Sequence, residues 1–412
     1  MRVAVLGGGI IGLCCAHYLQ KGGANVVVIE RDRVGGGCSY GNAGWVCPSI
    51  STPLPTPDLT VASLWSLFRS NGSLYIKPSA LPTLGPWLWA FRRHCNADSY
   101  ASGVKALAAL NVVTRELYQD LQFDGVQFDM AESGTLIVYS DEQSLSRSRA
   151  DIEGLEDFGV GPVDVLDRAG VSDAAPSLVG DSVGGLIVQS DFRVRSDTLC
   201  DGLATYLEGQ GVEVIEGFEV KDFVRDGTVT KSAIGPDGEV EADAFLLAAG
   251  AETSLLSAQL NAPLPVQAGK GYSITVENPG VTLSRPTYLA NAKIGFTPFD
   301  SSIRIVGTME LSGINLQFDA RRISVLERTT HRYLPGALQG DSRVDWVGMR
   351  PVTPDGLPVL GSLPTSDNTF VATGHQMLGV TLAPATGKAL AQLILKGDPE
   401  VDLTSFTPAR FQ

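Results

Sequence analysis

The first thirty residues show two short apolar runs on either side of a glycine cluster and a helical pattern. Residues 3–6 form a continuous apolar run, which predicts a buried strand of a parallel sheet. Apolar residues then recur at helical spacing from Ile10 to Leu19, and Gly22-Gly23 predicts where this helix ends. The second run, residues 25–29, predicts another buried strand and ends at Glu30.

Similar patterns continue along the chain. Helical patterns cover residues 101–122, 141–158 and 198–210, the last with Asp197 at its cap. Apolar runs predict strands at residues 134–139, 184–188, 212–214 and 218–220, a hairpin at 221–241, and a buried strand from 243 into a glycine turn at 250. Residues 263–310 alternate apolar and polar positions, which predicts a half-exposed antiparallel sheet. A last helix is expected to start at Pro384, whose missing N–H suits a first helical turn.

The glycine cluster has the spacing G-x-G-x-x-G, formed by Gly7, Gly9 and Gly12. The first allows a tight turn, the second lets a pyrophosphate approach the backbone, and the third lets the helix pack close to the strand. The helix start at Ile10 and Ile11 offers unpaired N–H groups and a partial positive charge to phosphates. Glu30, 18 residues beyond Gly12, can accept hydrogen bonds from ribose hydroxyls. We therefore predict a dinucleotide site, and the acid at this strand end disfavours NADP.

Composition limits the classes of protein that fit. At about 150 residues per domain, 412 residues allow two or three domains. With 31 basic and 45 acidic residues the net charge is −14, which argues against a nucleic-acid binder that tracks phosphates. No apolar run reaches the roughly 18 residues needed to span a bilayer.

The cysteines favour neither a metal site nor a disulfide framework. None forms a C-x-x-C pair, so we expect no metal and reduced thiols in the core, in a cytoplasmic protein. The six are Cys14, Cys15, Cys38, Cys47, Cys95 and Cys200. The apolar N-terminus has the basic start and apolar centre of a secretory signal, but no A-x-A cleavage site follows it.

The sequence after Glu30 is a loop of small residues, 31–44, which suits close backbone approach to a long, flat cofactor. It ends in the motif S-x-x-N-A-G and resembles the flavin-dependent oxidoreductases of the D-amino acid oxidase superfamily, most of all the bacterial D-amino acid dehydrogenases. The resemblance implies FAD as the cofactor. Within this loop it implies cofactor contacts at Arg31, Ser39, Asn42, Ala43 and Gly44.

Three further segments resemble the same family. One contains Val220, whose backbone is implied to meet the adenine, and another contains the turn at Ala249 and Gly250, which is implied to pass the pyrophosphate. The third runs from 370 to 387, where a helix start would place partial positive charge at the flavin N1–C2=O edge. The flavin contacts implied there are Gly374, Met377, Leu378, Gly379, Val380 and Thr381.

The resemblance implies an α/β fold: a discontinuous Rossmann-like FAD-binding domain with an inserted α+β substrate domain built on an antiparallel sheet. We expect the FAD-binding domain at residues 1–88, 150–260 and 340–412. The substrate-binding domain is then expected at residues 89–149 and 261–339.

Three residues are catalytic candidates. Arg350, in G-M-R-P, occupies the position that binds the substrate carboxylate in the resembled superfamily, although a structural ion pair would also explain it. Tyr272 could donate its hydroxyl to the same carboxylate or be an ordinary sheet tyrosine. His375 could position substrate or flavin, or stabilise a turn. Met377 stands where some superfamily oxidases carry a further arginine, which predicts a more apolar pocket.

The function expected is FAD-dependent oxidative deamination of D-amino acids to 2-oxo acids, by hydride transfer from Cα to flavin N5. Electrons would then pass to a quinone or another non-oxygen acceptor. Alternatives are an oxidase or dehydrogenase of glycine, sarcosine or cyclic imino acids such as D-proline or hydroxyproline, a nicotinamide dehydrogenase, and a non-enzymatic flavin-bound sensor or subunit.

Residues 59–95 are rich in aromatic side chains, with Trp65, Phe68, Trp87 and Trp89 among them and basic residues close by. Two interpretations stay open. Either the segment forms buried helices, or it is an amphipathic surface that contacts lipid or a partner. The second would place the protein peripherally on the inner face of the cell membrane.

Overall fold

The apolar runs of the N-terminus form the centre of a six-stranded sheet. The computed structural model describes residues 1–57, 72, 74–236 and 238–412. The strand order is β10 (Glu213–Ile215), β2 (Asn25–Ile29), β1 (Arg2–Leu6), β14 (Ala244–Leu247), β21 (Thr369–Thr373) and β20 (Val359–Ser362). All neighbours are parallel except β20 and β21. Alternate residues of β1 belong to different cores, so both faces of this sheet are covered.

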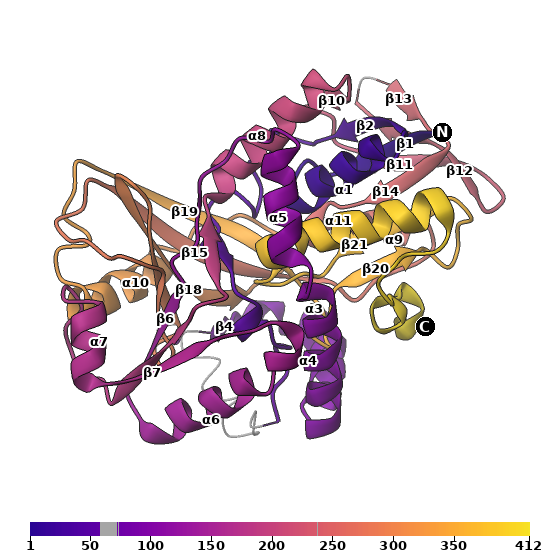
Figure 1. Ribbon diagram of the computed structural model, residues 1–412. Helices are drawn as coiled ribbons and strands as arrows, with labels where there is room; N and C mark the ends of the chain where they lie inside the picture. The colour runs from indigo at the N-terminus through magenta and orange to yellow at the C-terminus, as the bar shows by residue number, and fades with distance from the viewer. Residues whose placement is uncertain (58–71, 73, 237) are drawn as a thin grey trace.

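Helices cover one face of the parallel sheet (Figure 1). α1 (Ile10–Lys21) packs along α11 (Gly379–Lys396) and against α8 (Ser196–Gly209). α4 (Ala97–Asn111) and α5 (Thr114–Phe123) contact α11 from outside. The opposite face packs on α9 (Thr253–Gln259) and on an antiparallel sheet of β11 (Asp222–Asp226), β12 (Val229–Gly235) and β13 (Gly238–Glu241).

A larger sheet forms the second lobe. Its order is β19 (Ser342–Val352), β15 (Gln267–Glu277), β18 (Ser302–Leu311), β17 (Ile294–Pro298), β16 (Thr287–Leu289), β6 (Thr135–Tyr139), β8 (Gly184–Val188) and β7 (Val163–Asp167), and β4 (Leu74–Ile76) also pairs with β18. α10 (Ala320–Tyr333) and α7 (Arg168–Ala174) pack on one core of this sheet, and α6 (Glu142–Glu153) packs on another. The described chain thus combines a parallel α/β lobe with a mostly antiparallel sheet, as predicted.

Short elements complete the described fold. A small sheet contains β3 (Trp45–Val46), β9 (Phe192–Val194) and β5 (Met130–Ala131). Among the described residues, 3₁₀ turns occur at η1 (Pro48–Ile50), η2 (Pro78–Ala80), η3 (Glu156–Phe158), η4 (Gly250–Glu252), η5 (Thr404–Phe406) and η6 (Pro408–Phe411).

The sheets do not follow the predicted domain boundaries. β4, β7, β8 and β19 were placed in the FAD-binding domain, at 1–88, 150–260 and 340–412, yet all four belong to the large sheet. In turn, α4 and α5, placed in the substrate domain at 89–149, pack on α11 of the parallel lobe. An apolar run predicts that a strand is buried, but the sheet it joins depends on pairing with residues far along the chain.

Two helical predictions need correction. The pattern at 101–122 forms two helices, because the chain turns at Val112 and Val113 between α4 and α5. α11 starts at Gly379, so Pro384 lies inside the helix. Pro384 has no N–H for the carbonyl of Val380, four residues earlier, and the hydroxyl of Tyr118 donates to that carbonyl instead, at 2.6 Å. A buried tyrosine from α5 therefore satisfies the group that the proline leaves free.

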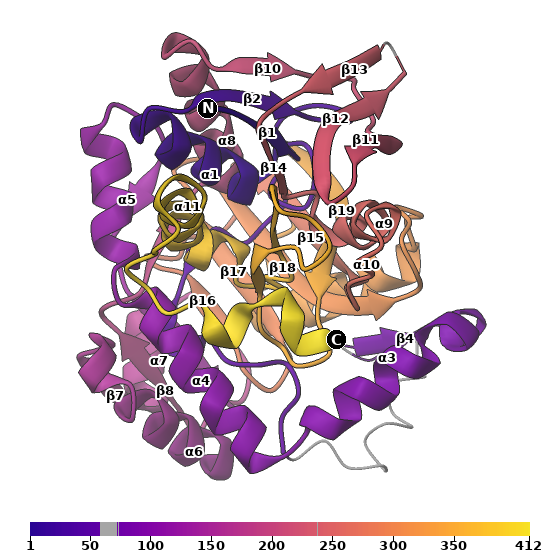
Figure 2. The ribbon, with the colours of Figure 1, turned by 90° about the vertical axis from the view of Figure 1, so that its right-hand side faces the viewer.

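The aromatic segment is described only in its second half. Leu59, Trp65 and Phe68 lie outside the described residues. In α3 (Leu81–His94), Trp87 and Phe91 are buried and stacked on each other, whereas Trp89 is 65% exposed. Figure 2 shows α3 at the edge of the molecule beside β4. No helix in the described part of the chain is long and apolar enough to cross a bilayer.

Candidate cofactor and substrate site

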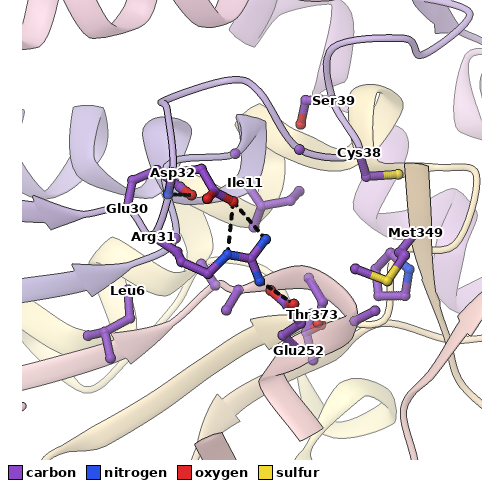
Figure 3. Close-up of a pocket in the computed structure, with 18 of the residues that line it drawn as sticks. Leu6, Ile11, Glu30, Arg31, Asp32, Cys38, Ser39, Glu252, Met349 and Thr373 are labelled. Carbon is purple, nitrogen blue, oxygen red and sulfur yellow. Dashed lines mark hydrogen bonds and ion pairs between the residues drawn. The ribbon is translucent and has the colours of Figure 1, made fainter. Parts of the chain in front are cut away.

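A cavity of about 670 Å³ lies where the carboxyl ends of the parallel strands face β19 of the large sheet. This volume is within the roughly 300–1,000 Å³ of ligand and cofactor pockets, and strand carboxyl ends are where open α/β sheets bind ligands. Figure 3 shows Leu6 and Glu30 toward one end and Cys38 and Met349 toward the other. The predicted cofactor residues that line it are Gly7, Gly9, Ile10, Ile11, Glu30, Arg31, Ser39, Asn42, Val220, Ala249, Gly250, Gly379 and Val380.

The glycine turn has the close packing that the motif predicts. A Cβ at Gly12 would lie 1.9 Å from the carbonyl oxygen of Gly7, so a side chain at residue 12 would push α1 away from β1. Gly9 precedes the first residue of α1 and has no side chain with which to cap this helix end. The N–H of Ile10 donates to Ser39 Oγ at 3.0 Å, which joins the helix start to the small-residue loop.

Glu30 organises this turn as well as facing the cavity. Its carboxylate accepts from the N–H groups of Gly8, at 2.7 Å, and Asp32, at 3.0 Å. Arg31, the next residue, reaches across the cavity to an ion pair with Glu252 of η4 and a second with Asp32, at 2.8 Å (Figure 3). Two of the predicted cofactor segments, one after β2 and one after β14, are thereby joined.

Arg304, which the sequence analysis did not select, fixes the loop at 40–42. Its Nη1 donates to the carbonyls of Asn42, at 2.8 Å, and Tyr40, at 3.2 Å, and it forms an ion pair of 3.3 Å with Asp197. The alternating pattern predicted a half-exposed sheet here, but Arg304 is 2% exposed. The one signal in the sequence was its charge, which the alternating pattern placed on the outer face of a strand.

Several predicted cofactor residues do not line the cavity. Gly12 and Gly44 make close backbone contacts, and Gly374 forms the turn after β21. The carbonyl of Ala43 accepts from Thr297, and Thr381 Oγ1 donates to Trp45. Met377 is 44% exposed, and Leu378 precedes α11. For these residues, contact with the cofactor stays a prediction.

Arg350 lies on β19 between two residues that line the cavity, Met349 and Pro351, and is not itself among the lining residues. Its Nη1 donates to the carbonyl of Thr308 at 3.1 Å. Among the described residues no carboxylate is close enough to form an ion pair with it. Burial lowers the pKa of Arg350, and the thiol of Cys38, which lines the cavity, acts in the opposite direction. This guanidinium therefore has no acidic partner in the described chain.

Tyr272 has a different partner from the one considered in the sequence analysis. Its hydroxyl donates to Glu310 at 3.0 Å, and Glu310 forms a buried ion pair of 2.9 Å with Lys270. Burial raises the pKa of Tyr272, with Glu310 adding to the effect. Tyr272 is 1% exposed and is not among the residues that line the cavity. A role for it in holding a carboxylate stays a prediction that this geometry does not support.

His375 does line the cavity, in the turn before α11. Its Nε2 is 3.1 Å from Thr386 Oγ1, and its Nδ1 is buried without a partner among the described residues. Burial lowers the pKa of His375 to about 3, so its imidazole is neutral at physiological pH. A neutral imidazole can orient a ligand or the turn but adds no charge to the site.

These features fit a flavin dinucleotide. The turn at Gly7–Gly12 and the start of α1 suit a pyrophosphate, Glu30 suits a ribose, and the start of α11 opens on the same cavity as β19. A long cofactor can therefore extend from the β2 end of the cavity to the β19 end. The unpaired Nδ1 of His375 belongs to a residue that lines that second end.

Comparison with known proteins agrees with this geometry. Residues 2–393 match the family described as FAD dependent oxidoreductase (DAO). The chain is 33% identical to a D-amino acid dehydrogenase of Bradyrhizobium diazoefficiens, over all of this chain and 99% of that protein. Among solved structures it resembles glycine oxidase from Geobacillus kaustophilus (TM-score 0.78, 23% identity, 99% of both chains). L-Proline dehydrogenase from P. horikoshii is also similar (TM-score 0.77, 19% identity, 100% of this chain and 97% of that one). The chain therefore belongs to the DAO family of FAD-dependent oxidoreductases, which makes it an FAD-binding enzyme.

Proposed function

We propose that this enzyme oxidises D-amino acids to 2-oxo acids and ammonia and passes the electrons to a quinone or another non-oxygen acceptor. The similarity to a D-amino acid dehydrogenase over the full length supports this substrate class. Bound FAD supplies the chemistry by accepting a hydride from the substrate Cα. The chain supplies binding, orientation and the electrostatic surroundings.

Arg350 carries the proposal. A partly buried guanidinium without an acidic partner is costly, because its loss of water is not offset by an opposite charge. An α-carboxylate would provide that charge and can form two parallel hydrogen bonds with the guanidinium. Arg350 adjoins the cavity, since its neighbours on β19 line it, as does Cys38, whose thiol acts on the pKa of Arg350. The carbonyl of Thr308 orients the guanidinium.

No protein base is required in this scheme. If the amine is bound in its neutral form, its lone pair stabilises the imine that develops as Cα loses hydride, and water then hydrolyses the imine. The neutral His375 is consistent with this, since a pKa of about 3 makes its imidazole a weak base for the amine proton. Arg350 would hold the carboxylate and so direct the Cα–H bond at the flavin.

The test is anaerobic flavin reduction by the Arg350→Lys variant. Lysine keeps the charge and loses the planar fork, so orientation should suffer as well as binding. We expect kcat/KM for a good D-amino acid to fall at least about a hundredfold, or roughly 2.7 kcal/mol of transition-state stabilisation. FAD content and reduction by dithionite should be unchanged.

A screen of D-, L- and N-methyl amino acids with wild-type enzyme defines the substrate class. Flavin bleaching by L- or N-methyl amino acids but by no D-amino acid would contradict the proposal. So would a lysine variant that substrate reduces at the wild-type rate, because Arg350 would then be structural.

α3 is where we propose contact with a membrane that carries the acceptor. Trp89 is exposed and the guanidinium of Arg93 lies 4.9 Å from its ring centroid, next to the exposed Arg92. Basic residues gain about 1 kcal/mol each near anionic lipid, which would offset the overall negative charge locally. Flotation with anionic liposomes at low salt tests this. The Trp89→Ala variant should float less than wild type, and wild type that stays at the bottom would exclude the contact.

A further inference from the structure

Gln376 occupies a constrained position against β19, the strand that carries Arg350. It lies in the turn between β21 and α11, and its backbone N–H donates to the carbonyl of Pro351 at 2.9 Å. Pro351 directly follows Arg350 on β19. Gln376 has a φ of 52°, a left-handed conformation that is uncommon for a residue other than glycine. Strained backbone conformations of this kind concentrate at functional sites.

The side chain of Gln376 lines the cavity and is only 4% exposed. Neither its Nε2 nor its Oε1 has a hydrogen-bond partner among the described residues. A buried amide normally pairs both groups, because water is lost as a partner on burial. One donor and one acceptor are thus held at the cavity without a protein partner.

The acceptor is the distinctive group at this end of the cavity. Among the described lining residues from β19 and from 372–380, Gln376 provides the only side-chain carbonyl or carboxylate oxygen. The hydroxyl of Thr373 already donates to the carbonyl of Gly250 at 2.7 Å, and the neutral His375 contacts Thr386. A ligand amine at this end of the cavity would find Oε1 of Gln376 free to accept from it.

We propose that Gln376 is a specificity-determining residue, which accepts a hydrogen bond from the substrate α-amino group while Arg350 holds the carboxylate. This inference rests on the proposed function and adds how the amine is recognised.

A neutral carbonyl suits this task. A carboxylate at the same place would stabilise an ammonium ion, and an ammonium nitrogen has no lone pair with which to assist hydride loss from Cα. The amide accepts from a neutral amine without adding negative charge. With carboxylate and amine both fixed and Cα–H directed at the flavin, the side chain has one remaining direction, so Gln376 would also contribute to the choice between D and L substrates.

The test compares each amino acid with its counterpart that lacks the amine. The ligands are D-alanine, D-valine and D-phenylalanine, paired with propanoate, 3-methylbutanoate and 3-phenylpropanoate. Apparent Kd values of the amino acids come from the concentration dependence of anaerobic flavin reduction, and those of the carboxylates from competition in the same assay. The variants Gln376→Met and Gln376→Glu keep side-chain length at this strained backbone.

Gln376→Met should bind D-amino acids about tenfold more weakly, the effect of a lost hydrogen bond, and bind the carboxylates as wild type does. Gln376→Glu keeps an acceptor for the amine but adds a negative charge. Binding of the carboxylates should therefore weaken more than binding of the amino acids. The ratio of the two affinities therefore moves in opposite directions in the two variants. A purely structural role for Gln376 would leave this ratio unchanged.

Equal weakening of both ligand classes in Gln376→Met would overturn the inference. An unchanged ratio together with a shifted flavin potential in the ligand-free enzyme would also overturn it, because Gln376 would then face the flavin. If Gln376→Met fails to retain FAD, Gln376→Glu provides the test. An unchanged ratio of amino acid to carboxylate affinity in that variant would overturn the inference. Wild-type flavin that no D-amino acid reduces would instead refute the proposed function, which distinguishes the two failures.

Discussion

A Cβ at Gly271 would lie 2.1 Å from Cζ of Arg350, so the guanidinium occupies the space where any other residue would place its side chain. Gly271 is on β15, and the neighbouring strands β18 and β19 carry Thr308 and Arg350. The pairing of β15 with β18 shifts register between Gly271 and Tyr272, and Thr308 at this irregularity has a φ of 54°. The bulge at Thr308 and the absence of a side chain at Gly271 together fix the position of the Arg350 guanidinium.

We therefore expect Gly271→Ala to displace the guanidinium and lower kcat/KM for a D-amino acid by at least about tenfold, or 1.4 kcal/mol. FAD content should be retained. The control is the same change in an Arg350→Ala background, where no guanidinium remains to be displaced. A further loss in the double variant as large as in the single one would mean that Gly271 acts independently of Arg350.

Glu30 is the residue through which FAD retention can be tested. Glu30→Ala should weaken FAD binding by roughly 1–3 kcal/mol, since a charged hydrogen-bond acceptor is lost. Glu30→Gln keeps one side-chain oxygen for the N–H of Gly8 or Asp32 and should be intermediate. Flavin release during dialysis and re-titration with FAD measure the affinity of both variants for FAD. If the alanine variant keeps its flavin as wild type does, Glu30 does not bind the ribose.

The bond from Tyr118 to Val380 predicts coupling between α5 and α11. Tyr118→Phe leaves the Val380 carbonyl buried without a partner and should lower the free energy of unfolding of the FAD-saturated enzyme by about 1–3 kcal/mol. Pro384→Ala restores an N–H four residues from Val380. In that background Tyr118→Phe should therefore lower the free energy of unfolding by less. Urea unfolding of the four proteins gives the coupling energy, and a value of zero would contradict this account.

Asp191 predicts a pH dependence of stability. It is fully buried between β8 and β9, and burial raises its pKa to about 7, against the opposing hydrogen bonds from Ser49. The unfolded chain loses this proton near pH 4 and the folded chain near pH 7, so stability should fall as pH rises across that window.

Asp191→Asn, which cannot ionise, should therefore gain Tm relative to wild type as pH is raised from about 4 to 8. The exposed Asp157→Asn is the control and should show no such trend. A constant difference between wild type and Asp191→Asn would mean that burial does not raise the pKa of Asp191.

The cofactor cradle could be predicted because it is local. The strand, the turn at Gly7–Gly12, the helix and Glu30 lie within the first thirty residues, and each depends on sterics or periodicity of neighbouring positions. The family comparisons confirm the predicted FAD cofactor, the enzyme class and the fold class. The apolar runs of β1 and β2 also predicted a parallel sheet, because a strand that is covered on both faces has apolar residues at successive positions.

The β19 end of the cavity, where we propose that substrate binds, is different, because long-range strand pairing builds it. Arg350 was selected by its motif, but the sequence did not show that Gly271 on β15 makes room for it or that the carbonyl of Thr308 orients it. Arg304 looked half-exposed and is buried, and Tyr272 points its hydroxyl at Glu310. A period-two pattern tells which positions share a face of a strand. Which residues of other strands meet that face depends on register and bulges, which form only when distant segments of the chain pair.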